Sequence, residues 1–414
     1  MRTKTATLAV GAALTMALAA CGGDAEPQTT DESGIDFQGT LVIWTDEERA
    51  ESLKPVVQEF ADANGIEIEV QGIAENLQDQ FVTASEQGEG PDILVQAHDW
   101  IGNLVQNGAI EPIPLTEEQQ AAMNPDALRA VTYDGQIYGT PYAMENLALI
   151  RNTDLAPEAP ATIEEMVATG NELKDAGDVE DVLSIEVGKD GNPYNAYPFY
   201  ASAGGYLFGQ DAEGNYDPAD LGLAKPEAVD AFEKLAWLGE EGAMKTTMGP
   251  EHAIPMFAEG KTAFLVTGPW AMNQIREAGI SYDITPIPSF EGGDPATPFI
   301  GTQTFFVASK GENKAFAQEF VADFITGADL ATKLYESDPR PPVNIEAASA
   351  AAESDPDMAK FLAAGEGGYI LPAIPEMQAV WEPFGRAHAA VISGDDVEAA
   401  VKGAADAIQE AIGA

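Results

Sequence analysis

Cysteine is nearly absent from this sequence: Cys21 is the only one among 414 residues. A single thiol excludes an intrachain disulfide, so a folded body must derive its stability from its core. The three histidines, His98, His252 and His388, lie far apart without paired ligand spacing, which argues against a catalytic metal site. The sequence also lacks a G-x-S-x-G elbow and a P-loop. We therefore expect no metal and no cofactor.

Basic residues are also scarce. The chain has 20 Lys and Arg against 69 Asp and Glu, and its formal charge is −49 at pH 7. This charge excludes nucleic acid as a partner, because phosphate binding needs clustered Lys and Arg. It also disfavours anionic substrates and anionic lipid surfaces. Neutral or cationic ligands remain. We interpret the acid, which is spread along the chain, as a strongly hydrated surface; attraction of cations is the alternative.

Long apolar runs are absent except at the N-terminus. There a basic start precedes the uncharged residues 6–20, a pattern typical of a secretory signal and too short to cross the ~30 Å hydrocarbon core of a bilayer. The string LAAC, ending at Cys21, resembles the bacterial lipobox, in which the cysteine is lipidated after cleavage. An ordinary signal peptide with an incidental cysteine is the alternative. We expect a signal peptide over 1–20, a lipidated Cys21 and a flexible tether over 21–36.

This N-terminus predicts where the protein works. The lipid would hold the chain at the extracytoplasmic face of the cell membrane, and the chain would contact the membrane only through this anchor. The body that follows is long enough for two domains of ordinary size.

Strand-like and helix-like stretches alternate along that body. Short apolar runs predict strands, and segments with one apolar face predict helices. The first half reads as strands over 41–44, 66–70 and 92–95, with helices over 48–63 and 78–87. The same alternation recurs later, with strands over 147–150 and 263–267 and helices from Thr162 (capped with Glu165), over 226–239 and over 314–325. This order predicts an α/β fold of two lobes, with mostly parallel sheets covered by helices on both faces.

Polar and aromatic residues follow the predicted strands, where binding residues of such sheets gather. Asp46 and Glu47 follow the first strand, and Asp99 follows the third. Trp270 and Trp381 stand at later turns. Sugars suit this combination, because carboxylates accept hydrogen bonds from hydroxyls and an indole covers the apolar face of a pyranose. Each residue also has a structural interpretation, as a helix cap for the carboxylates and as packing for the tryptophans.

A family resemblance supports the sugar interpretation. The strings GTLVIW, GPDILVQAHD, YGTPYAMENLALIRNTDL, NPY, EGKTAFLVTGPWAM, PFIGTQTFFVAS and LPAIPEMQAVW occur in the order found in bacterial maltose/maltodextrin-binding proteins. These are receptors of sugar ABC importers within the wider extracellular solute-binding proteins. The resemblance runs from about Gly39 to the C-terminus.

The resemblance implies a type II periplasmic-binding-protein fold, with a ligand cleft between two lobes joined by crossing hinges. The lobes would comprise 37–144 plus 304–348 and 149–298 plus 354–414, with hinges near 145–148, 299–303 and 349–353. It further implies a monomeric receptor that closes around a neutral oligosaccharide and docks on separate permease subunits with their ATPase.

The resemblance also implies the site residues. They are Asp46, Glu47, Arg49, Asp99, Trp100, Glu145, Tyr194, Trp270 and Trp381. Departures from the family pattern occur at Gln96, where some members have Trp, at Trp100, where some have Arg, and at Asn192, where an acid is frequent. These departures leave the sugar open among maltose, longer or cyclic dextrins, trehalose and other oligosaccharides.

Two other classes of function remain to be compared with a non-enzymatic receptor. Paired carboxylates such as Asp46 and Asp99 would serve a surface glycoside hydrolase if they lay about 5–9.5 Å apart. An adhesive lipoprotein would bind glycans without taking them up. Release of reducing sugar, or glycan-dependent attachment without an uptake defect, would identify them.

Overall fold

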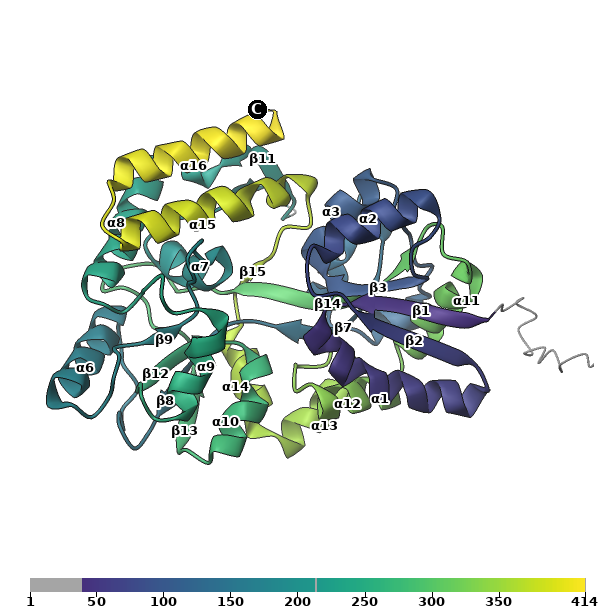
Figure 1. The fold of residues 1–414 in the computed structure, drawn as a ribbon, viewed down its shortest axis with the longest axis horizontal. Helices are drawn as coiled ribbons and strands as arrows, with labels where there is room; N and C mark the ends of the chain where they lie inside the picture. The colour runs from purple at the N-terminus through teal and green to yellow at the C-terminus, as the bar shows by residue number, and fades with distance from the viewer. Residues whose placement is uncertain (1–38, 213, 414) are drawn as a thin grey trace, which may run out of the picture. The chain divides into compact units, whose positions relative to one another are not determined.

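The computed structural model describes residues 39–212 and 214–413. The predicted signal peptide, Cys21 and the tether lie outside these residues. Contacts divide the chain into Met1–Asp36 and Phe37–Ala414. The second unit is a mixed α/β fold built on two larger sheets (Figure 1).

The larger sheet has seven strands around β14. β1 pairs in parallel with β2 and β3, whereas β14 is antiparallel to β3, β4 and β7 and parallel to β15. Its strands are β1 (Thr40–Thr45), β2 (Glu67–Gly72), β3 (Ile93–Ala97), β4 (Ile110–Glu111), β7 (Thr140–Glu145), β14 (Phe299–Ala308) and β15 (Tyr369–Ile370).

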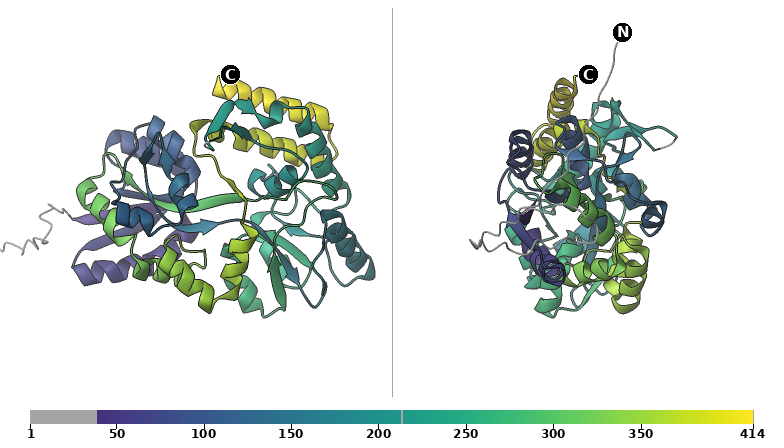
Figure 2. Two further views of the ribbon diagram at one scale, coloured as in Figure 1. Left: turned by 180° about the vertical axis from the view of Figure 1, so that it is seen from behind. Right: turned by 90° about the vertical axis from the view of Figure 1, so that its right-hand side faces the viewer.

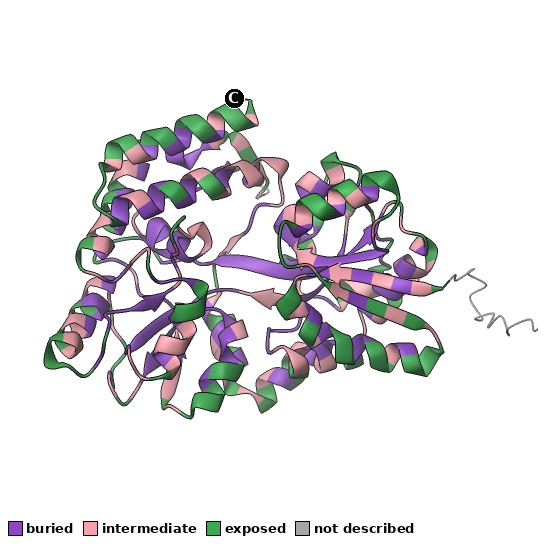
Figure 3. Cartoon of the chain, in the orientation of Figure 1, coloured by how far each residue is buried: buried purple, intermediate pink, exposed green. Residues whose placement is uncertain are grey.

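Side chains of this sheet pack on both faces, as the continuous apolar runs predict. On β3, Ile93 belongs to one hydrophobic cluster and Leu94 to another, because successive side chains of a strand point to opposite faces. Phe305 and Phe306 of β14 divide in the same way, and β14 is buried along its whole length (Figure 3). The helices of this part are α1 (Glu47–Asn64), α2 (Leu77–Gln87), α3 (Ile101–Gln106), α4 (Glu117–Ala121), α5 (Pro125–Ala130), α11 (Lys314–Glu319), α12 (Ala328–Ser337) and α13 (Ile345–Ser354).

The start of the body follows the sequence prediction closely. α1 begins where the Asp46 side chain accepts from the backbone N–H of Arg49, and it ends at Gly65, whose φ of 67° is left-handed and favours glycine. The predicted helix over 314–325 is less regular, because α11 passes into a π-helical turn at Phe320–Phe324.

The second sheet has the order β13–β8–β12–β9. β8 is antiparallel to both β12 and β13, and only β12 and β9 are parallel. The prediction of mostly parallel sheets is therefore wrong for this one, and in the larger sheet three of the six pairings are parallel and three antiparallel. The apolar pattern of a strand covered on both faces is the same in either direction, so it does not determine how neighbours run. The strands are β8 (Ala148–Asn152), β9 (Ser184–Ile185), β12 (Phe264–Thr267) and β13 (Tyr282–Thr285).

Helices also cover both faces of the second sheet. Leu149 and Val266 pack in a large cluster with α7, α8 and α15, whereas Ile150 and Leu265 pack with α9 and α10. α15 and α16 lie side by side at the C-terminal end (Figure 2). The helices here are α6 (Ile163–Ala176), α7 (Pro193–Ser202), α8 (Glu227–Glu240), α9 (Pro250–Ala258), α10 (Met272–Ala278), α14 (Pro356–Ala364), α15 (Gln378–Ile392) and α16 (Val397–Ile412).

Two short hairpins complete the fold. They are β5 (Thr132–Tyr133) with β6 (Gln136–Ile137), and β10 (Phe208–Gln210) with β11 (Tyr216–Leu221). Within 39–212 and 214–413, none of the helices has the length and apolar character needed to cross a bilayer.

Candidate functional site

The carboxyl ends of β1 and β3 bring Asp46, Arg49 and Gln96 together. Asp46 Oδ1 accepts from the backbone N–H of Arg49 at 2.8 Å, and its other oxygen pairs with the Arg49 guanidinium. Arg49 Nη1 donates to Gln96 Oε1 at 3.0 Å, and Gln96 Nε2 donates to Asp46 Oδ2 at 3.4 Å. β1 and β3 are parallel neighbours, so their carboxyl ends meet at one edge. Asp46 is thus a helix cap, as its structural interpretation predicts, and its other oxygen belongs to a polar group at the strand ends.

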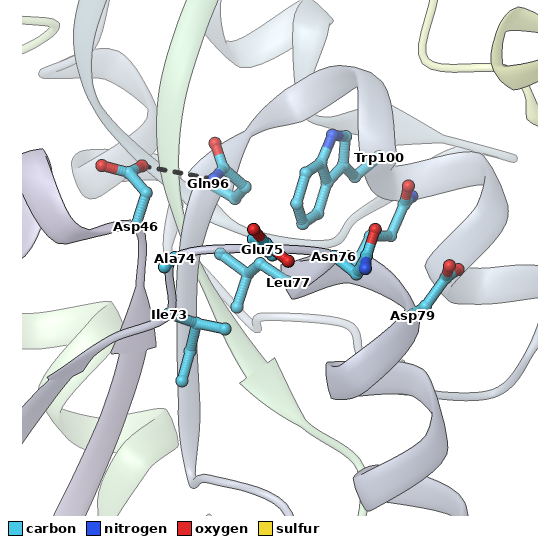
Figure 4. A pocket seen from close by; sticks show the side chains of 10 residues that line it. Asp46, Ile73, Ala74, Glu75, Asn76, Leu77, Asp79, Gln96 and Trp100 are labelled. Atoms are coloured by element: carbon cyan, nitrogen blue, oxygen red, sulfur yellow. Dashed lines mark hydrogen bonds between the residues drawn. The ribbon is translucent and has the colours of Figure 1, made fainter.

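Asp46 and Gln96 also line a pocket of about 360 Å³ (Figure 4). Residues 73–79 and Trp100 complete its lining, and Figure 4 shows the indole of Trp100 beside Gln96. Glu47 differs from its neighbour: it is exposed, and its side chain forms no hydrogen bond or ion pair with any residue that the structure describes.

Glu145, at the end of β7, binds two side chains that the sequence did not single out. Gln303 Nε2 donates to Glu145 Oε1 at 2.8 Å, and Arg340 Nε donates to Oε2 at 2.9 Å. The side chains of Glu145 and Arg340 are only 12% and 8% exposed. Gly301 lies opposite Glu145 in the ladder, and a Cβ there would be 3.2 Å from Glu145 Cγ. The glycine therefore leaves room for the carboxylate.

Asp99 is the most deeply buried of the predicted carboxylates, with 4% exposure. It lies in the 3₁₀ turn His98–Trp100 and receives a hydrogen bond from Trp381 of α15. Burial raises the pKa of Asp99 to about 7, while its own backbone N–H and then Trp381 lower it. Neither this turn nor α3 has a side-chain cap, so the interpretation of Asp99 as an N-cap is wrong.

The predicted aromatic residues lie around Phe299, the first residue of β14. The ring centroids of Tyr194 and Trp381 are 5.7 and 6.2 Å from that of Phe299. Trp270 lies 6.3 Å from Tyr194, and its ring covers Gly268, where a Cβ would be 2.0 Å from the indole. The Arg340 guanidinium carbon is 5.8 Å from the Trp270 ring centroid. Arg340 therefore links Glu145, with which it pairs, to the aromatic residues around Phe299.

The charges of these residues also shift one another's pKa values. Burial and then the charge of Glu145 raise the pKa of Tyr194 well above its usual value, whereas Arg340 lowers it. Burial disfavours the charge of Arg49, but nearby groups, among them Asp46 and Glu145, raise its pKa. Of the predicted residues, the structure thus brings together Asp46, Arg49, Asp99, Trp100, Glu145, Tyr194, Trp270 and Trp381.

Several polar atoms in this region are buried without a hydrogen-bond partner among the described residues. They are Arg49 Nε, Tyr142 Oη, Tyr194 Oη and Gln303 Oε1. Buried polar groups in proteins are nearly always satisfied by protein, water or ligand, so these atoms are available to a ligand or water.

His98 stabilises the backbone beneath this region. Its Nδ1 accepts from the backbone N–H of Thr302 at 3.1 Å, so Nε2 carries the proton and donates to the carbonyl of Leu371 at 2.7 Å. Burial lowers the pKa of His98 to about 4. The histidine is therefore neutral and structural.

A second pocket, of about 820 Å³, contains none of the predicted site residues. Among its lining residues are Arg129, Tyr133, Tyr216 and Tyr369. In the part of the chain that the structure describes, no three His, Cys, Asp or Glu side chains gather in a way that would hold a metal ion.

Comparison with known proteins adds independent findings. The family model described as bacterial extracellular solute-binding protein matches residues 56–360. A galactooligosaccharide-binding protein of Bacillus subtilis is 27% identical over 398 residues, which cover 92% of this chain and 91% of that protein. A maltooligosaccharide ABC transporter solute-binding lipoprotein of Streptococcus pneumoniae is 27% identical over 417 residues, with 99% and 97% covered. A maltotriose-binding protein of Pyrococcus abyssi is 29% identical over 315 residues, with 74% and 66% covered.

Proposed function

The chain belongs to the bacterial extracellular solute-binding proteins, and from this premise we propose that it is the receptor of an ABC sugar importer. It captures a neutral oligosaccharide, of the maltodextrin type in the first place, and delivers it to the membrane permease. The names of the relatives from Bacillus, Streptococcus and Pyrococcus support an oligosaccharide ligand.

The observation that carries this proposal is the pocket that the carboxylate of Asp46 and the indole of Trp100 line together (Figure 4). A carboxylate beside an indole is the combination that a pyranose requires, since hydroxyls donate to the one and C–H groups cover the other. We assign the sugar contacts to Asp46, Arg49, Asp99, Trp100, Tyr194, Trp270 and Trp381, and Glu145 takes part through the side chains that it binds. Glu47 remains a prediction from the resemblance.

The charges of the site suit a neutral ligand. Arg49 is paired with Asp46, and Arg340 is paired with both Glu145 and Asp338. An anionic sugar would meet no unpaired cation at either arginine. A strongly negative chain would also repel it.

The proposed mechanism is closure of a type II binding-protein fold. The lobes are 37–144 plus 304–348 and 149–298 plus 354–414, with hinges near 145–148, 299–303 and 349–353. Each of the two larger sheets has clusters of its own, and β14 carries Phe299 in a cluster of one and Phe305 in a cluster of the other, which supports this division. A sugar that contacts both lobes stabilises the closed form through its differential contacts.

The proposed location is the extracytoplasmic face of the cell membrane, where a lipidated Cys21 anchors a monomeric receptor near its permease and ATPase. The lipoprotein named among the relatives supports the anchor. Replacement of Cys21 by Ala should release a folded, sugar-binding protein from the membrane fraction. Continued partitioning of the variant into the detergent phase would argue against lipidation.

A thermal-shift screen tests the function directly. Maltose to maltoheptaose, cyclodextrin, trehalose and β-linked galactooligosaccharides are each added to the protein. A ligand at 100 times its Kd stabilises a protein by about 2.7 kcal/mol, so a true ligand raises Tm clearly. No shift with any neutral oligosaccharide would reject the proposal, and a preference for galactooligosaccharides would replace its maltodextrin part.

A further inference from the structure

We propose that Gln303 and Arg340 form a pair that binds sugar hydroxyls, and that Glu145 is the positioning residue for both. The inference rests on the proposed function and extends its site by two residues. Gln303 lies within the string PFIGTQTFFVAS but was not predicted as a site residue, and Arg340 lies outside the quoted strings; both are brought to the site by hydrogen bonds to one carboxylate.

Gln303 supplies the acceptor of this pair. It lies on β14 and is 2% exposed. A carboxylate oxygen only accepts, so the contact of 2.8 Å with Glu145 fixes the amide nitrogen on that side and the carbonyl oxygen on the other. Gln303 Oε1 is buried and has no hydrogen-bond partner among the described residues. It is therefore an oriented acceptor without a donor.

Arg340 supplies the donor. Its Nε donates to Glu145 at 2.9 Å, and its Nη1 pairs with Asp338. No acceptor for Nη2 is found among residues 39–212 and 214–413. Two carboxylates thus hold the planar guanidinium in one orientation and leave one of its nitrogens for a ligand.

The two groups together match the chemistry of a hydroxyl, which donates one hydrogen bond and accepts others. A hydroxyl can donate to Gln303 Oε1, and it or its vicinal neighbour can accept from Arg340 Nη2. Because Glu145 and Asp338 balance the charge of Arg340, the pair does not require an anion. Arg340 also lies 5.8 Å from the Trp270 ring centroid, so the hydroxyls belong to the sugar unit beside Trp270.

The test compares two conservative variants by titration calorimetry. Gln303→Met approximates the length of the side chain and removes the acceptor together with the amide donor to Glu145, and Arg340→Lys preserves a cation near Glu145 and removes the planar fork. The matched control is Arg151→Lys, since Arg151 is 6% exposed and pairs with Asp283 at 3.2 Å outside the site. The probes are maltotriose and a β-linked galactotriose, and Tm without sugar establishes that each variant is folded.

We expect each site variant to bind the sugar at least tenfold more weakly than the wild type, and the control to bind it unchanged. Monodeoxy derivatives of the bound trisaccharide sharpen the result. The loss in each variant should vanish for the one derivative that lacks the hydroxyl bound by the pair. Purely structural damage would weaken all derivatives equally.

Wild-type affinity in both folded variants, with sugar binding intact in the wild type, would overturn the inference and leave the receptor function standing. An equal loss for every derivative would overturn it too. Failure of the wild type to bind any neutral oligosaccharide would instead overturn the proposed function, and with it the inference.

Discussion

Two buried carboxylates in the candidate site, Glu145 and Asp99, differ in their partners. Glu145 has a cation and an amide at 2.9 and 2.8 Å, one on each oxygen. Asp99 has no cation beside it among the described residues: its own backbone and Trp381 are the groups that lower its pKa, and burial raises this pKa to about 7. The first region is an ion-pair network, and the second is a single acid in a poorly solvated turn.

The two carboxylates should therefore respond differently when a neighbouring group is changed. Removal of one partner of a buried ion pair is costly because it leaves an uncompensated charge, whatever the net contribution of the intact pair. A carboxyl buried without a counterion is easier to keep neutral, and it gains when a ligand supplies hydrogen-bond donors. We therefore expect loss of the cation beside Glu145 to act on folding as well as on the sugar, and changes at Asp99 to act first on the sugar and on pH dependence.

The largest effect is expected for Arg340→Ala. The change leaves Glu145 buried without its cation, and removal of one partner of a buried pair costs about 3–5 kcal/mol. Urea unfolding of the sugar-free protein measures this loss. A loss below about 1 kcal/mol would show that the two carboxylates do not differ as described.

A pH dependence of stability is expected next. The pKa of Asp99 is about 7 in the folded protein against 3.8 for an ordinary Asp. The folded state therefore binds the proton more tightly, so the contribution is complete below pH ~4 and is lost as pH rises through ~7. It amounts to at most roughly 4 kcal/mol for such a shift.

The measurement is the difference in unfolding free energy between wild type and Asp99→Asn at several pH values, with no sugar present. The amide does not titrate, so the difference isolates Asp99 from the many other acids. A difference that stays constant between pH 4 and 8 would contradict a raised pKa.

Sugar affinity should depend on pH in the opposite direction to stability, because sugar binding uses the ionised form of Asp99. Ionised Asp99 accepts hydroxyl hydrogen bonds, so Asp99→Asn should weaken binding about ten- to a hundredfold, as expected for hydrogen bonds to charged groups of about 1.5–3 kcal/mol. Wild-type affinity should also rise with pH through ~7, whereas that of the variant should not. Normal binding by the variant would assign Asp99 a structural role only.

The smallest effects concern Trp381. Replacement by Ala should weaken binding by about 1–3 kcal/mol through loss of the platform. Replacement by Phe retains a flat ring and removes the indole donor to Asp99, which should cost about 0.5–1.5 kcal/mol. If both variants bind like the wild type, Trp381 is a packing residue.

Local features of this fold were predictable from the sequence. The apolar run of β1, the Asp46 cap and Gly65 mark α1 within about a residue, because each acts over a few neighbouring positions. The position of Asp99 after β3 was likewise visible, because a strand followed by a turn places polar groups at a sheet edge.

No local sequence pattern indicated that Gln303 or Arg340 would lie at the site. Gln303 lies within a run of buried residues on β14, and Arg340 lies in a loop between α12 and α13. The contact of Gln303 with Glu145 depends on the antiparallel register of β7 and β14, in which Gly301 leaves space for the carboxylate. Arg340 reaches Glu145 because the bridge between Ala143 and Pro342 holds its loop beside β7. Strand direction and register arise from long-range packing, which is also why the prediction of parallel neighbours for β8 is wrong.

The central claim, a receptor that binds a neutral oligosaccharide without altering it, is tested most directly by one calorimetric titration. Wild-type protein is titrated with maltotriose and with β-linked galactotriose, and each sugar is recovered afterwards and analysed by mass spectrometry. We expect one sugar molecule to bind per chain and the intact trisaccharide to be recovered in full. Absence of binding for both sugars, or recovery of shortened products, would contradict it.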